Sequence, residues 1–172
     1  MRKLESIDER LIAAAPASLY PMLVDFREYQ RFWPADSEFK VTSATDALVG
    51  SRAVCSLPKN RGRFDWVLES AEPNQRIGIR HDGLFRGRGT WTFAAEQGGT
   101  RLRFAVDLEI VPLLGRILSH VIDVQQAHSS FMQRVFDGLA REAAARQQAT
   151  RQATRQAEAA PAAPGYGDWS PS

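Results

Sequence analysis

Residues 113–146 read LLGRILSHVIDVQQAHSSFMQRVFDGLAREAAAR, and this stretch decides the fold because its apolar residues recur at intervals of three, four and seven. The spacing predicts one long helix with a single apolar stripe. The stripe comprises Leu114, Ile117, Leu118, Val121, Val124, Gln125, His128, Phe131, Met132, Val135, Phe136 and Leu139. The alternation of apolar and polar residues over 39–111 instead predicts strands. A lone helix that follows antiparallel strands can cover one face of a curved sheet and can leave a pocket between the two layers.

The strand pattern is clearest in residues 101–110, where apolar and polar residues alternate as in a strand with one buried and one wet face. The apolar set is Leu102, Phe104, Val106, Leu108 and Ile110. Six further strands are predicted at residues 6–12, 39–45, 51–57, 64–69, 76–81 and 85–95. Asp82-Gly83 is typical of a short hairpin between the last two of these.

Two short helices are predicted between the first and second strands. Pro16 suits the first turn of a helix, where its missing N–H costs nothing. A second helix follows from Phe26, and Asp25 is expected to cap it by accepting a backbone N–H bond. Pro34 ends it, because the residue before a proline is pushed out of the helical region.

Length and composition narrow the class of protein. The 172 residues suit one domain, residues 1–146, and a tail, residues 147–172, made of a polar helical extension and a segment disordered by composition. No run of 18 apolar residues exists, so no integral membrane segment is expected. The N-terminus lacks the pattern of a signal peptide, which predicts a cytoplasmic protein. Cys55 is the single cysteine and no Cys/His cluster occurs, so neither a metal site nor a cofactor is expected.

The positive charge comes almost wholly from arginine, because only three of the 22 basic residues are lysines, Lys3, Lys40 and Lys59. Acidic residues are interspersed, and the net charge is +2. This distribution argues against a basic stripe, so no nucleic-acid partner is expected. Arg80, Arg86 and Arg88 cluster near the Asp82-Gly83 hairpin, which suits either a solvated edge or a mouth for an acidic head group. The oligomeric state stays open.

The predicted order is a strand, two short helices, six strands and a long helix. With Ala15-Pro16, Leu23-Val24-Asp25 and Phe32-Trp33-Pro34, it resembles the START-like (SRPBCC) superfamily. Residues 89–93, GTWTF, and residues 99–102, GTRL, are similar to the late hairpin of that superfamily. The polyketide cyclase/dehydrase-like and coenzyme-Q-binding-like branches are the most similar. The resemblance implies an α+β helix-grip fold: a curved antiparallel sheet of about seven strands wrapped around the last helix, with a cavity for a hydrophobic molecule.

The residues expected to line that cavity lie on the inward faces of the predicted strands and on the helical stripe. They are Trp66, Ile79, His81, Trp91, Phe93, Phe104, Val106, Val124, His128 and Met132. Each can equally be a packed core residue. His81 and His128 are the inward polar candidates, either as handles for a ligand carbonyl or hydroxyl or as a general acid or base. Apolar surroundings are expected for His128, because it lies on the helical stripe between Val124 and Met132.

Three functions fit these patterns. The first is a binding protein for a lipid, isoprenoid quinone or polyketide-like molecule, in a cavity of at least a few hundred Å³. The second is an enzyme of the polyketide cyclase/dehydrase type, for which the sequence assigns no catalytic residue. The third is an interaction protein without a ligand. Paired titratable groups facing inward favour the enzyme, a cavity lined by carbon favours the binding protein, and a collapsed interior favours the interaction protein.

Overall fold

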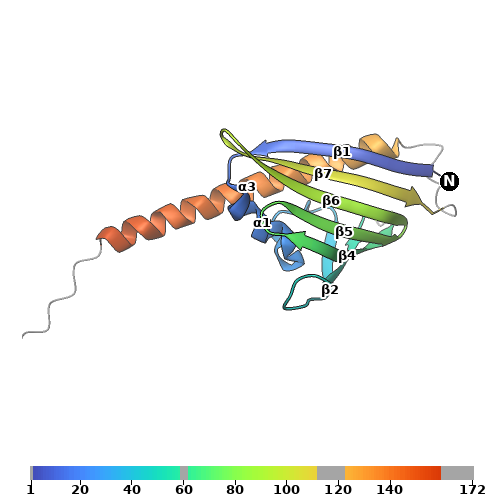
Figure 1. Cartoon of the computed structure of the whole chain (residues 1–172), viewed down its shortest axis with the longest axis horizontal. Coiled ribbons are helices and arrows are strands. Elements are labelled where there is room, and N and C mark those ends of the chain that lie inside the picture. Colours follow the sequence, from blue (N-terminus) through green and yellow to red (C-terminus); the bar gives the residue numbers. More distant parts are fainter. Residues whose placement is uncertain (1, 59–61, 112–122, 160–172) are drawn as a thin grey trace, which may run out of the picture.

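The computed structural model describes residues 2–58, 62–111 and 123–159. Seven strands form one antiparallel sheet in the order β1-β7-β6-β5-β4-β3-β2. Their bounds are β1 Arg2–Ile12, β2 Glu38–Ser43, β3 Arg52–Ser56, β4 Arg63–Glu72, β5 Arg76–Gly83, β6 Phe85–Glu96 and β7 Gly99–Ile110. Strands β2 to β7 form a meander, and β1 pairs with β7, so β1 and β2 lie at the two edges of the sheet (Figure 1).

From Leu102 to Ile110 the inward face of β7 is apolar, as its alternation predicts. Leu102, Phe104 and Leu108 are each at most 3% exposed. They alternate with Arg103, Asp107 and other side chains that point to the opposite, convex face. Such a strand buries its apolar face and exposes its polar face to water. Other elements of the fold therefore have to pack only on the apolar, concave face of the sheet.

Two short helices lie between β1 and β2. Helix α1 spans Pro16–Val24 and the 3-10 helix η1 spans Phe26–Arg31. Pro16 occupies the first turn of α1, where no backbone N–H is needed. The Asp25 carboxylate accepts the backbone N–H of Arg27 at 2.9 Å, which confirms its predicted role as the cap of the second helix.

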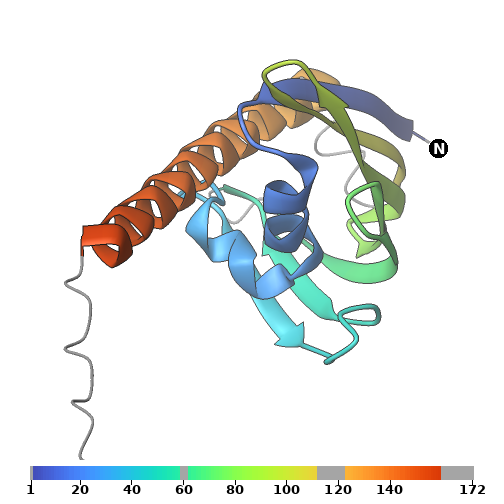
Figure 2. The same cartoon turned by 60° about the vertical axis from the view of Figure 1, so that its left-hand side comes forward.

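Helix α3 spans Val124–Ala159 and crosses the concave side of the sheet before projecting beyond it (Figures 1 and 2). Asp123 precedes it, and its carboxylate accepts the N–H groups of Gln125 and Gln126. The helix therefore begins at Val124, and the predicted helical residues 113–122 lie outside the described ranges. From 148 to 159 every side chain is exposed, so this part buries nothing on the domain.

The predicted stripe on α3 is confirmed for its central part. Met132, Val135, Phe136 and Leu139 are each at most 2% exposed. Gln125, by contrast, is exposed, so its place on the stripe was wrong: its amide side chain stays in water, where its polar groups remain solvated. The residues on this stripe close the open side of the curved sheet.

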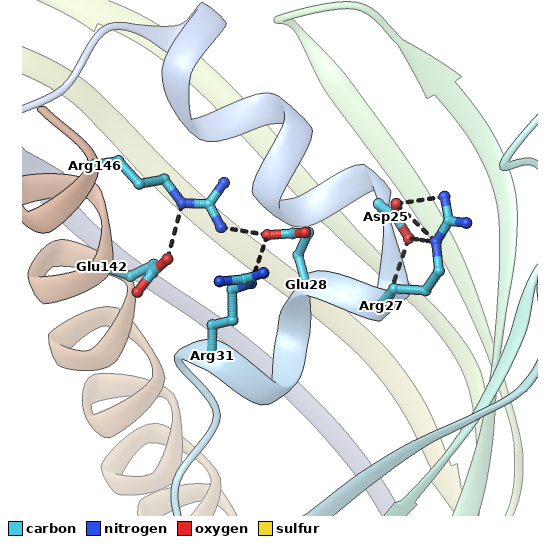
Figure 3. Close-up of polar contacts among 6 residues, drawn as sticks. All are labelled: Asp25, Arg27, Glu28, Arg31, Glu142 and Arg146. Atoms are coloured by element: carbon cyan, nitrogen blue, oxygen red, sulfur yellow. Dashed lines mark hydrogen bonds and ion pairs between the residues drawn. The ribbon is translucent and has the colours of Figure 1, made fainter. Parts of the chain in front are cut away.

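An ion pair links α3 to η1. Glu28 of η1 pairs with both Arg146 of α3 and Arg31, and Arg146 also donates to Glu142 at 2.9 Å (Figure 3). Gly138 lets the helix approach closely, because a Cβ there would lie 2.0 Å from the carbonyl oxygen of Phe32. These contacts hold the middle of α3 against η1 and leave its first turns to cover the rest of the sheet.

The observed architecture is the α+β helix-grip fold that the resemblance implied, with seven strands, two short helices and a long C-terminal helix. The helix-rich N-terminal segment and the middle of α3, where Val135, Phe136, Leu139 and Ala143 are buried, pack one end of the concave face. The first turns of α3 cover the other end, and the cavity lies there.

Candidate functional site

A cavity of about 270 Å³ lies between the concave face of the sheet and the first turns of α3. Fourteen of the seventeen residues that line it are apolar, and His81, His128 and Arg134 are the exceptions. The lining residues are Leu4, Trp33, Leu57, Pro58, Phe64, Trp66, His81, Phe85, Phe104, Val106, Leu108, Val124, Ala127, His128, Phe131, Met132 and Arg134. Its volume is close to the lower end of the usual range for ligand pockets.

Seven of the ten residues predicted from the sequence lie on this lining. They are Trp66, His81, Phe104, Val106, Val124, His128 and Met132. The sheet contributes the first four and α3 contributes the last three. The structure thus brings together the inward faces of β4, β5 and β7 and the start of the helical stripe.

The other three predicted residues, Ile79, Trp91 and Phe93, lie in the packed core away from the cavity lining. Phe136 of α3 contacts Trp91 edge-on with ring centroids 5.9 Å apart. Tyr20 of α1 contacts Phe93 in the same way at 5.8 Å. Side chains from the two helices therefore fill this end of the concave face.

Aromatic rings form one wall that the sequence did not assign to the cavity. Trp33 follows η1 and meets Trp66 edge-on, with centroids 5.7 Å apart. Phe131 of α3 contacts Trp33 at 5.4 Å. Both had apolar spacing consistent with a helical stripe, but that spacing gives no sign of which stripe residues meet a void. Pro58 lies just after the strand predicted at residues 51–57, so strand alternation could not assign it to a face.

His81 of β5 is buried at 2% exposure against Trp66, whose ring centroid lies 4.7 Å away. Neither of its ring nitrogens has a hydrogen-bond partner within residues 2–58, 62–111 and 123–159, and the same holds for Nε1 of Trp66. Burial, together with the nearby His128, lowers the pKa of His81 to about 3, so the ring is neutral at physiological pH. A buried polar group without a partner is uncommon and costly, which marks this wall as a place for a polar ligand atom or water.

Gly89 of β6 makes room for the His81 ring. A Cβ at this position would lie 2.7 Å from Nε2 of His81 and 2.8 Å from Cζ of Phe104. Only glycine leaves both rings in their observed places. The sequence marked Gly89 as part of the late hairpin without indicating this packing role.

His128 sits beside a buried acid that the sequence analysis did not identify. Its Nδ1 lies 3.3 Å from Oδ2 of Asp8, which points inward from β1 and is 5% exposed. Burial by itself raises the pKa of Asp8, but interactions with His128, Ser129 and Ser6 outweigh it and hold the pKa below its usual range. The expectation of purely apolar surroundings for His128 was therefore wrong, and the acid is ionised at neutral pH.

Arg134 is engaged at the edge of the lining. Its guanidinium donates to Asp36 at 2.8 Å and lies 5.3 Å from the ring of Phe131. The arginines near the hairpin lie on the convex face and pair with acids: Arg80 and Arg88 with Glu69, and Arg86 with Asp82. A solvated edge therefore describes them better than a mouth of the cavity.

Other reactive groups lie away from this site. Burial raises the pKa of the Cys55 thiol to about 12, so it is not a thiolate nucleophile. Among the described residues, no three His, Cys, Asp or Glu side chains converge as metal ligands. No described helix has the length and hydropathy needed to span a membrane.

The cavity can interact with a bound molecule in two ways. Its carbon lining can take the apolar part of the molecule out of water, and His81 and the Asp8–His128 pair can form hydrogen bonds with polar atoms at two separate places on the wall. The Phe104 ring stacks parallel to that of His128, with centroids 6.4 Å apart, and it also stacks against Trp66 at 6.1 Å. Flat aromatic surfaces thus connect the two polar sites.

Solved structures of low sequence identity share this fold. A protein of Thermus thermophilus is 22% identical with a TM-score of 0.64, and the match covers 84% of this chain and 98% of that one. The di-domain ARO/CYC StfQ of the steffimycin biosynthetic pathway matches at 14% identity and a TM-score of 0.65, over 85% of this chain and 52% of that one. A norcoclaurine synthase of Thalictrum matches at 8% identity and a TM-score of 0.62, and the match covers 85% of this chain and 97% of that one.

The comparison with curated proteins gave no match. The family described as polyketide cyclase / dehydrase and lipid transport matches residues 5–144, which span β1 to the buried part of α3. This match covers most of the helix-grip fold and every residue of the cavity lining except Leu4, and it confirms the START-like resemblance that the order of elements indicated. The chain therefore belongs to the polyketide cyclase / dehydrase and lipid transport family.

Proposed function

We propose that this protein binds a hydrophobic small molecule in the cavity between the sheet and α3. The observation that carries the proposal is the lining itself, in which fourteen of seventeen residues are apolar and come from both layers of the fold. A lipid, isoprenoid quinone or polyketide-like molecule has the carbon surface that such a lining takes out of water.

The polar atoms of the wall also support a bound ligand. Both ring nitrogens of His81 and Nε1 of Trp66 are buried without a partner among the described residues. A ligand in the cavity takes its apolar surface out of water and can give these nitrogens hydrogen-bond partners.

An enzyme of the cyclase/dehydrase type is the second candidate, and the Asp8–His128 pair favours it. A histidine that lines a cavity and contacts a buried carboxylate is suited to accept a proton from a bound molecule. The interaction protein without a ligand has less support, because its expected collapsed interior is replaced by a cavity.

Native mass spectrometry of the protein purified from its own host tests the proposal. We expect one small hydrophobic molecule per chain. Val106→Trp should abolish its retention by filling the cavity, whereas Ala105→Trp, on the neighbouring residue that faces the convex side, should retain it. Equal retention by both variants, with both shown to be folded, would place the ligand elsewhere and contradict the proposal.

A further inference from the structure

A polar cluster lies directly behind the cavity wall, between β1 and α3. The Ser6 hydroxyl donates to Oδ2 of Asp8 at 2.9 Å and lies 3.3 Å from Oγ of Ser129. The Asp8 carboxylate also faces Nδ1 of His128, which itself lines the cavity. Two inward residues of a strand are thus polar where the fold normally places apolar ones.

Nδ1 of His128 lies 3.3 Å from Oδ2 of Asp8 but has no well-aligned hydrogen-bond partner among the described residues. The negative charge of the ionised Asp8 beside Nδ1 favours the tautomer in which Nδ1 carries the proton. In that tautomer Nε2 has a free lone pair. Because His128 lines the cavity, Nε2 can accept a hydrogen bond from a molecule bound there.

We propose that the ligand is an apolar molecule with one weakly acidic hydroxyl, a phenol or an enol, which donates to Nε2 of His128. Asp8 is the positioning residue. This inference rests on the proposed function, since it names the chemistry of the ligand for the same cavity.

A weakly acidic hydroxyl fits this site better than a carboxylic acid. A carboxylate is already ionised in water, and its charge must be desolvated on entry into a lining made mostly of carbon, with the Asp8 charge nearby. A phenol or enol enters neutral and shares its proton only at His128. The neutral ring of His81, with both nitrogens unpartnered among the described residues, can bind a second oxygen of the same molecule.

Calorimetric titration with 1-naphthol and its methyl ether, 1-methoxynaphthalene, tests the inference. The two probes share the same ring system, but only the first can donate a proton. We expect 1-naphthol to bind about tenfold more tightly, the size of one hydrogen bond. Asp8→Asn should remove most of this preference and leave the affinity for the ether unchanged. Asp137→Asn, which removes an exposed acid of α3 paired with Arg10 of β1, should preserve the preference.

Nitrogen NMR of the imidazole gives a readout that a merely structural role for Asp8 would not change. We expect the signature of an Nδ1–H ring in the parent protein and a shift toward mixed tautomers in Asp8→Asn. Equal affinity for the two probes would overturn the inference while leaving hydrophobic binding intact. Failure of both probes to bind would overturn the proposed function as well. A preference that persists in a folded Asp8→Asn variant would refute the role of Asp8.

Discussion

Replacing His81 with phenylalanine should remove a large part of the acid sensitivity of the fold. The folded-state pKa of His81 is lowered from 6.5 to about 3, because the ring is buried. The unfolded chain therefore takes up a proton below pH 6.5, while the folded chain does so only near pH 3. The contribution of His81 to the free energy of unfolding is fully present above about pH 6.5. It is lost progressively as the pH falls toward 3.

The magnitude follows from the two pKa values. Between pH 7 and pH 5, linkage gives a loss of about 2 kcal/mol in the free energy of unfolding. The pKa of Asp8 lies below its ordinary value of 3.8, so this acid stays ionised in both states over most of that range and adds little to the slope. The pH interval from 5 to 7 thus reports mainly on histidine.

Urea unfolding at pH 7 and pH 5 measures the effect. The parent protein should lose about 2 kcal/mol more than His81→Phe between the two pH values. Ile79→Val is the matched control, because it changes a buried residue on the same face of β5 and should cost about 1 kcal/mol at both pH values. Parent and His81→Phe curves with the same pH dependence would refute the assignment of His81 as a buried neutral ring.

Three further predictions follow from the packing around the cavity. Phe104→Ala should cost about 3 kcal/mol in denaturant unfolding, since the ring is 1% exposed and packs against Trp91 with ring centroids 4.4 Å apart; a loss below about 1 kcal/mol would contradict that burial. Gly89→Ala should destabilise the fold and perturb the His81 imidazole signals by NMR, because the new Cβ would lie 2.7 Å from Nε2; unchanged signals would contradict the close contact. Arg146→Ala should cost less than about 1 kcal/mol, because solvent screens this partly exposed ion-pair network; a larger loss would show that the network anchors α3.

Much of the fold could be predicted because most strands bury one apolar face. The alternation in β7 and the stripe on α3 each indicated their element and its inward side, and the order of elements then indicated the helix-grip fold. The cavity lining was harder to predict. Periodicity separates inward from outward residues, but Trp91 and Phe104 both face inward, and only the three-dimensional placement of Phe136 decides which of them borders a void.

Asp8 was missed because β1 departs from the usual pattern. Its inward residues include Ser6 and Asp8, at 6% and 5% exposure, while Ile7 and Leu11 on the outer side are 59% and 44% exposed. A rule that places hydrophobic residues inside therefore assigns the wrong face of β1 as the buried one in this region. The polar inward residues are explained by His128 and Ser129 on the helix opposite them, a contact between residues more than a hundred positions apart that no local pattern reveals.

The same distance in sequence explains why the enzyme and the binding protein could not be separated from the sequence. A histidine on an apolar stripe is usually a core residue. The Asp8 carboxylate at 3.3 Å makes His128 a candidate for proton transfer, and that neighbour is present only when β1 pairs with β7 and brings its inward face beneath α3.

Methyl NMR during a titration with an apolar probe such as naphthalene tests the central claim most directly. If the cavity binds hydrophobic molecules, the methyl signals of Val106 and Met132 on its lining should shift and saturate together at one probe per chain. The methyl group of Met22, which is fully buried outside the cavity, should stay unchanged. Shifts confined to the exposed methyl groups of Ile7 and Leu11, or no saturable shift on the lining, would contradict the account.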